Sequence, residues 1–173
     1  TPFWRTLREG LQRGLNSGAS WVLSVDADII PAPDLYDKAR ACVDHVENDI
    51  GVITFMVQDK LLFGNRYMAI RIYRAAAIPD MLALMPPLGG GVRPESSTIT
   101  RLVERGWRHK LVPEVLALHD YEQFYRDIYR KAYLHMQKHG ARMARLLELW
   151  MRLADHDSDY QAALAGATDA MLE

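Results

Sequence analysis

The stretch Trp21-Val-Leu-Ser-Val-Asp-Ala-Asp-Ile-Ile-Pro31 decides the fold, because it places two carboxylates directly after an apolar run. The run WVLSV predicts a buried strand. In an open α/β sheet, ligands bind beyond the carboxyl ends of the strands. Since residues i and i+2 of an extended chain point to the same side, Asp26 and Asp28 can face one site. In the alternative interpretation, Asp26 only ends the strand and Asp28 is solvated in a turn.

Helices and strands alternate along the rest of the chain. Apolar periodicity predicts helices over residues 3–16, 33–46, 95–105 and 121–153, the last with a break at Gly140, and buried strands over 51–57 and 67–73. We also expect a short helix over 75–85 interrupted at Pro79, an extended segment over 107–118 broken by Pro113, and a surface helix over 155–173. This order favours an α/β fold.

The composition narrows the functional class. The chain has 173 residues, of which 49% are hydrophobic and 25% charged, as in ordinary globular domains. A formal net charge of -1 gives no reason to expect a nucleic-acid partner. Cys42, the single cysteine, excludes an intrachain disulfide and fits a reducing compartment. No signal-peptide pattern and no apolar run near ~20 residues occur, so we expect a cytoplasmic protein.

Four features follow one another along the chain: the Asp26–Asp28 pair, three glycines at 89–91, Pro94-Glu95-Ser96, and Leu118-His119-Asp120. In this order they resemble the GT-A glycosyltransferases, especially the bacterial family 2 enzymes, over about residues 5 to 139. The resemblance implies a partial GT-A (Rossmann-like) mixed sheet flanked by helices, with a helical C-terminal extension. Residues 1–120 would form the partial catalytic domain, and residues 121–173 would form the extension packed on it.

The resemblance implies roles for Asp26 and Asp28 of the aspartate pair and for His119. In that family an Asp-x-Asp motif at a strand end binds a divalent metal and the diphosphate of a nucleotide sugar. Asp28 matches the direct metal ligand, and Asp26 matches the residue that contacts the ribose or reaches the metal through water. His119 matches a histidine that ligates the metal in some members. Carboxylates joined by one imidazole fit Mn²⁺ or Mg²⁺.

Glu95 opens a helix that resembles a further motif of the family. In the segment Glu95-Ser-Ser-Thr-Ile-Thr-Arg-Leu-Val-Glu-Arg-Gly106, Arg101 and Gly106 fall in register with that motif. The register implies that Glu95 is the catalytic base, a position usually held by aspartate, and it places Pro94 where the family has another acid. The alternative is that Glu95 simply favours the helix N-terminus through the helix dipole.

Aromatic and basic residues interleave over residues 121–140. Arg126 and Arg130 stand at i and i+4, so one helix face can clamp phosphate, and the resemblance implies that this phosphate is the donor diphosphate. The alternative is an amphipathic helix with solvated charges, in which Asp127 pairs with Lys131. The glycine loop at 89–91 would either form part of an acceptor pocket or be a flexible linker.

The resemblance thus implies a metal-dependent inverting glycosyltransferase, or a fragment of one, that uses a nucleotide-sugar donor and a saccharide or lipid-linked acceptor. A full GT-A domain has two or three strand–helix units before the first helix seen here, so we expect a missing N-terminal half as a partner. A peripheral membrane contact follows if the acceptor is lipid-linked. Two alternatives stay open: a non-catalytic GT-A remnant serving as an interaction module, and a haloacid-dehalogenase-type phosphatase.

Overall fold

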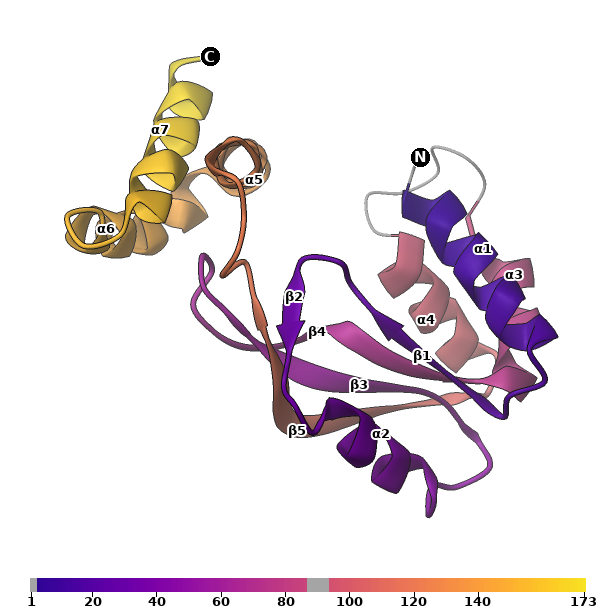
Figure 1. Ribbon diagram of the computed structural model, residues 1–173. Helices are drawn as coiled ribbons and strands as arrows, with labels where there is room; N and C mark the ends of the chain where they lie inside the picture. Colours follow the sequence, from indigo (N-terminus) through magenta and orange to yellow (C-terminus); the bar gives the residue numbers. More distant parts are fainter. Residues whose placement is uncertain (1–2, 87–93) are drawn as a thin grey trace. The chain divides into compact units, whose positions relative to one another are not determined.

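The computed structural model describes residues 3–86 and 94–173 and divides into two compact units (Figure 1). The first unit comprises Thr1–Ala27, Pro31–Val57 and Asn65–Ala117, and the second comprises Asp28–Ile30, Gln58–Gly64 and Leu118–Glu173. Helices flank a mixed five-stranded sheet, which confirms the α/β fold class. The predicted domain boundary at residue 120 stays a prediction, and the glycines at 89–91 lie outside the described residues.

The sheet has the strand order β1-β4-β3-β5-β2. Its strands are β1 Trp21–Val25, β2 Ile29–Pro31, β3 Ile50–Asp59, β4 Gly64–Arg74 and β5 Arg108–His119. β1 pairs with β4 in the antiparallel direction, from Trp21 opposite Arg74 to Val25 opposite Ile70. The strand predicted from WVLSV therefore forms, but the expectation that it is buried is wrong. It lies at the edge of the sheet, where Leu23 is 38% exposed and Val25 41% exposed.

The core of the first unit lies between the sheet and three helices. The helices of this unit are α1 Phe3–Asn16, α2 Leu35–Val43, α3 Ile78–Leu84 and α4 Pro94–Glu104, and a 3₁₀ turn, η1 Ala75–Ala77, precedes α3. Leu11 of α1, Met81 of α3 and Leu102 of α4 pack with Val52 and Tyr73 of the sheet. α1, α3 and α4 gather on one side of the sheet, and α2 lies on the other (Figure 1).

Two prolines behave differently from what the sequence predicts. Pro79 does not interrupt a helix, because it lies in the first turn of α3, where an N–H has no partner within the helix anyway. Pro113 does not break β5, which runs without interruption from Arg108 to His119. The neighbouring β2 has only three residues, and the Ala32 N–H bonds the Leu116 carbonyl, so β2 lies beside the later half of β5. Pro113 is exposed in the earlier half, where a missing donor is tolerated.

Helices make up most of the second unit: α5 Tyr125–His139, the 3₁₀ turn η2 Gly140–Met143, α6 Ala144–Leu153 and α7 Ser158–Leu172. The predicted break at Gly140 is confirmed, and this glycine has a φ of 49°. The helix expected from residue 121 begins only at Tyr125. Among the helices that the structure describes, none has the length and apolar character needed to cross a bilayer.

α7 contributes to the core of the second unit, which corrects the expectation of a surface helix. Its Ala163 and Ala167 are buried with Trp150 of α6 and Ile128 of α5. At Gly166, a Cβ would lie 2.2 Å from the carbonyl oxygen of Tyr129, so the glycine allows α5 and α7 to approach closely. Trp150 of α6 is therefore a core residue of the second unit.

Candidate functional site

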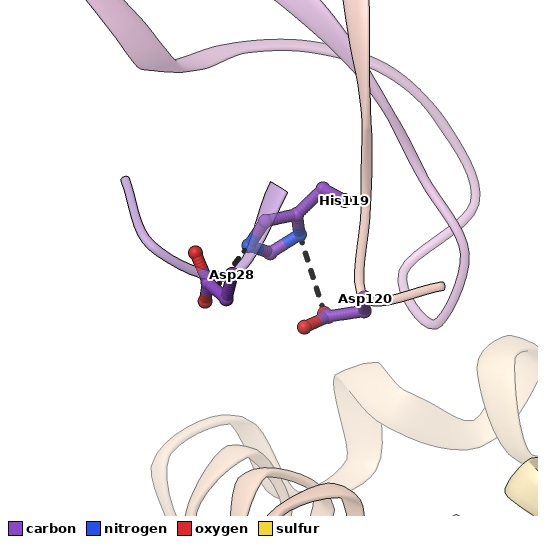
Figure 2. A group of neighbouring side chains, drawn as sticks. All are labelled: Asp28, His119 and Asp120. Atoms are coloured by element: carbon purple, nitrogen blue, oxygen red, sulfur yellow. Dashed lines mark ion pairs between the residues drawn. The ribbon is translucent and has the colours of Figure 1, made fainter. Parts of the chain in front are cut away.

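A cluster of three carboxylates, one imidazole and one ammonium lies within the second unit. Asp28 lies in the turn between β1 and β2, Asp59 ends β3, and His119 ends β5 with Asp120 directly after it; Lys131 comes from α5. One ligand atom each of Asp28, His119 and Asp120 lies within 4.8 Å of the others. Figure 2 shows the imidazole of His119 between the two carboxylates.

His119 is at the centre of this cluster and is buried. Its Nε2 lies 3.4 Å from Asp28 Oδ2, and its Nδ1 lies 3.1 Å from Asp59 Oδ2 and 3.2 Å from Asp120 Oδ2. Burial by itself lowers the pKa of His119, but hydrogen bonds to Asp28 and Asp59 and the charge of Asp120 outweigh it and raise the pKa to about 9. At neutral pH both ring nitrogens therefore carry a proton in this arrangement.

The two carboxylates in Figure 2 have opposite environments. The hydrogen bond from His119 is the main cause of a lowered pKa at Asp28, which is 39% exposed. Burial raises the pKa of Asp120, although the Lys131 ammonium opposes this effect. Asp120 has a φ of 64°, a left-handed conformation that aspartate adopts more readily than most residues. Its Oδ1 accepts from Lys131 Nζ at 2.5 Å, while its buried Oδ2 makes no hydrogen bond with any residue that the structure describes.

The chemistry of these side chains fits a hard divalent cation. Carboxylate oxygens with a single imidazole nitrogen are ligands that Mn²⁺ and Mg²⁺ accept. The Asp120 Oδ2 atom is a buried acceptor that lies 3.2 Å from His119 Nδ1 but makes no hydrogen bond with the described residues, so it keeps the capacity to bind a cation or a further donor. Lys131 Nζ lies 2.5 Å from Asp120 and 3.8 Å from Asp28, so an ammonium already stands near both carboxylates. A metal ion bound to His119 Nε2 would have to replace the proton there.

The sequence predicts Asp28 and His119 as metal ligands, a role that stays a prediction, but it indicates no role at this site for Asp59, Asp120 or Lys131. The signal for Asp120 was its position beside His119, and the signal for Asp59 was an acidic residue closing an apolar strand. The expected pairing of Asp127 with Lys131 is replaced by two other contacts. Lys131 pairs with Asp120, and Asp127 pairs with Arg126 at 3.6 Å.

A cavity of about 330 Å³ adjoins the cluster within the second unit. Its lining includes Asp28 and Asp120 on one hand and basic side chains of α5 on the other, among them Arg130, Lys131 and Lys138. Of the two arginines predicted to contact a diphosphate, Arg130 therefore borders this cavity. Arg126 has a side chain that is 86% exposed. A cavity with both carboxylates and cationic groups can hold a phosphate group together with its metal ion.

Glu95 belongs to the first unit, where it lies in the first turn of α4 and is only 9% exposed. Arg71 Nη1 donates to Glu95 Oε2 at 2.5 Å, and the Tyr73 hydroxyl donates to Oε1. Burial and the charge of Glu95 raise the pKa of Tyr73 well above its usual range. Both oxygens of the Glu95 carboxylate therefore accept a hydrogen bond from the protein. Its catalytic role stays a prediction.

Asp26 also belongs to the first unit, whereas Asp28 belongs to the second. Asp26 follows the last residue of β1, and its backbone N–H donates to the Ala69 carbonyl at 3.0 Å. The expectation that Asp26 and Asp28 serve one nucleotide site therefore also stays a prediction.

Comparisons with known proteins give structural likeness alone. No family model matches the chain, and no curated protein sequence matches it. A mannosyltransferase from Pyrobaculum calidifontis in complex with GDP-Man and Mn²⁺ aligns with a TM-score of 0.47 and 18% identity, over 95% of this chain and 53% of that one. A glycosyltransferase involved in glycosylation of the major capsid of PBCV-1 aligns with a TM-score of 0.49 and 14% identity, over 72% of this chain and 71% of that one. The chain spans about half the length of the first protein, and at these identities the likeness concerns the fold alone.

Proposed function

We propose that the chain carries the metal- and diphosphate-binding part of an inverting glycosyltransferase. The observation that supports this most is the convergence of Asp28, His119 and Asp120, whose ligand atoms lie within 4.8 Å of one another beside a cavity with basic side chains. The motif order in the sequence, which resembles GT-A enzymes, is an independent argument for the same function.

In this proposal Asp28, Asp120 and His119 hold the divalent ion. When bound, Mn²⁺ or Mg²⁺ supplies positive charge that stabilises the departing nucleoside diphosphate. Asp59 accepts from His119 Nδ1 and so fixes the ring with Nε2 toward Asp28, as carboxylates beside metal-bound histidines do. Arg130 borders the same cavity and binds phosphate oxygens of the donor.

Glu95 acts as the base in this proposal, and Asp26 orients the nucleotide. Glu95 removes the proton from an acceptor hydroxyl as that oxygen forms a bond to the anomeric carbon of the donor sugar. The bond from the anomeric carbon to the phosphate oxygen breaks at the same time, and the nucleoside diphosphate leaves with the electron pair. One displacement inverts the anomeric configuration. Arg71 and Tyr73 hold the Glu95 carboxylate in position through hydrogen bonds to its two oxygens.

Calorimetric titration of UDP and GDP, with and without Mn²⁺, tests the proposal. We expect Mn²⁺ to tighten nucleotide binding in the unmodified chain and Asp28→Asn to weaken it at least tenfold. Asp155→Asn, a substitution at an exposed aspartate of the same unit, is the matched control and should leave binding unchanged. Nucleotide affinity that is the same with and without Mn²⁺ and in Asp28→Asn would contradict the proposal. No nucleotide binding at all would favour the non-catalytic alternative. Hydrolysis of a simple phosphate ester would instead favour the phosphatase.

A further inference from the structure

A second cavity of the second unit, about 430 Å³ in volume, has a lining rich in aromatic side chains: Tyr121, Glu122, Gln123, Phe124, Tyr125 and Asp159. We propose that it binds a neutral saccharide. Its volume lies within the range of small-molecule sites, about 300 to 1,000 Å³. That the bound saccharide is the acceptor rests on the proposed transferase function, whereas saccharide binding itself does not.

The aromatic side chains offer faces on which a sugar ring can stack. Phe124 is 79% exposed and Tyr125 58% exposed, so much of their ring surface is available to a ligand. The Tyr125 hydroxyl is hydrogen-bonded to Ser158 Oγ at 2.7 Å, which holds that ring in place before a ligand arrives. The C–H groups on one face of a pyranose carry slight positive charge and complement the negative face of an aromatic ring.

Polar side chains at the same cavity match the hydroxyl groups of a sugar. Glu122 is exposed and offers carboxylate oxygens, which accept from hydroxyls. Gln123 has an amide that can both donate and accept. A few polar groups beside aromatic surface therefore give the cavity both an apolar contact and directional hydrogen bonds.

The charges around the cavity argue against an ionic ligand. Lys60 Nζ lies 5.8 Å from the centre of the Tyr121 ring and pairs with Asp157 at 2.7 Å and with Asp159. A cationic ligand stacked on Tyr121 would meet this ammonium. An anionic ligand would meet the carboxylate of Glu122. A neutral molecule with hydroxyl groups avoids both repulsions.

The position of the cavity suits an acceptor sugar. Gln123 lines both this cavity and the one that contains Asp28, Asp120 and Arg130. Both cavities lie within the second unit, so a saccharide on Phe124 and Tyr125 would be a neighbour of the proposed diphosphate site. This adjacency is what a transfer between two bound substrates requires.

Saturation-transfer NMR with methyl glycosides of mannose, glucose, galactose and N-acetylglucosamine tests the inference, without metal or nucleotide. We expect transfer to the ring protons of at least one glycoside and at least a fivefold loss of that signal in Phe124→Ala. Tyr36→Ala is the matched control, because Tyr36 is an aromatic residue of the first unit that is 66% exposed. Tyr125→Ala should also lose signal, and thermal unfolding of each variant should match the parent because these rings are mostly exposed.

Three outcomes would overturn the inference: no transfer to any of the four glycosides, equal transfer in the parent and Phe124→Ala, or preferential binding of choline or inorganic phosphate. Asp28→Asn separates this inference from the proposed function, since it should abolish metal-dependent nucleotide binding and leave saccharide transfer intact. Saccharide binding without any nucleotide binding would contradict the proposed transferase function but not the proposed saccharide site.

Discussion

The two units hold their buried carboxylates in opposite ways. In the first unit the Glu95 carboxylate accepts from one guanidinium and one hydroxyl, and Arg71 Nε is buried without a hydrogen-bond partner among the described residues. In the second unit three carboxylates surround His119, two of them, Asp28 and Asp120, also lie near Lys131, and Asp120 Oδ2 is buried without a hydrogen bond to the described residues. Among the described residues, the cluster around Glu95 thus contains a buried donor without an acceptor, and the cluster around His119 contains a buried carboxylate oxygen without a hydrogen bond.

This difference indicates two kinds of ligand. An unused N–H attracts an oxygen atom, such as that of a hydroxyl group, whereas an unused carboxylate oxygen beside further carboxylates attracts a cation. Glu95 is an ion-pair partner of the mostly buried Arg71, so removal of its charge should damage the fold. The Asp28–His119–Asp120 cluster carries an excess of acidic groups, so its removal should change ion binding.

The largest expected effect is on stability, from Glu95→Gln. This change leaves the Arg71 guanidinium, whose side chain is 11% exposed, without its counter-charge. Breaking a buried pair costs about 3–5 kcal/mol, so we expect a loss of this order in the free energy of unfolding. Chemical denaturation would measure it, with Glu104→Gln on the exposed face of the same helix as control. A loss below about 1 kcal/mol would mean that the carboxylate does not balance Arg71, while Mn²⁺ binding by the second unit should persist.

The stability of the chain should depend on pH in opposite directions at two histidines, His119 and His109. In the folded chain the pKa of His119 is raised to about 9. The contribution of His119 to the free energy of unfolding of the metal-free chain is therefore complete below the unfolded-state pKa near 6.5, and it is lost as the pH rises through 9. His109 of the first unit has a pKa lowered by burial, so it destabilises the chain as the pH falls through 6.5. Unfolding curves at pH 5.5, 7.5 and 9.5 in EDTA would measure both effects.

Substitution of each histidine provides the controls for that experiment. His119→Asn should remove the loss of stability on the alkaline side, and His109→Asn should remove the loss on the acid side. If His119→Asn and the parent lose the same stability between pH 7.5 and 9.5, the three carboxylates do not hold a proton on this ring.

Local sequence patterns predicted much of the fold because the deciding forces are local. Residues 3–16 form a helix as expected, since apolar residues at steps of four give it one buried face. Pro113 was misjudged because its tolerance depends on the three-residue length of β2, which no local rule contains. The burial of α7 was missed because it depends on Gly166 meeting the backbone of Tyr129, a contact between separate helices.

The site was predictable to the same extent. Asp28 and His119, which the structure brings together, are predictable because Asp28 lies in the turn after β1, His119 ends β5, and each matches a motif by position. Asp59 is 60 positions from His119, and the contact between them exists only after β3 and β5 have formed. Lys131 was placed on α5 but with the wrong partner, because an i, i+4 rule considers only residues of the same helix.

Asp59→Asn tests whether the orientation of His119 matters for metal binding. Asp59 is fully buried and accepts from His119 Nδ1 at 3.1 Å. Loss of such a partner typically weakens metal binding 10- to 100-fold, so we expect Mn²⁺ affinity to fall by that factor in an electron paramagnetic resonance titration. Asp49→Asn, at an exposed aspartate of the first unit, should leave the affinity unchanged. An unchanged affinity in Asp59→Asn, with the fold intact by circular dichroism, would remove the positioning role.

The smallest change in Mn²⁺ affinity should come from Lys131→Met, and the direction of that change is informative. The ammonium of Lys131 lies 2.5 Å from Asp120 and 3.8 Å from Asp28, so it competes with a metal ion for the same carboxylates. Removing it should tighten Mn²⁺ binding by about three- to tenfold, because a like charge near the ion is lost. Lys138→Met is the control: Lys138 lines the same cavity, and its loss should weaken GDP binding with little change for Mn²⁺ alone. Weaker Mn²⁺ binding in Lys131→Met would mean that the lysine organises the carboxylates rather than substituting for the ion, and the excess of negative charge in the second unit would then be structural.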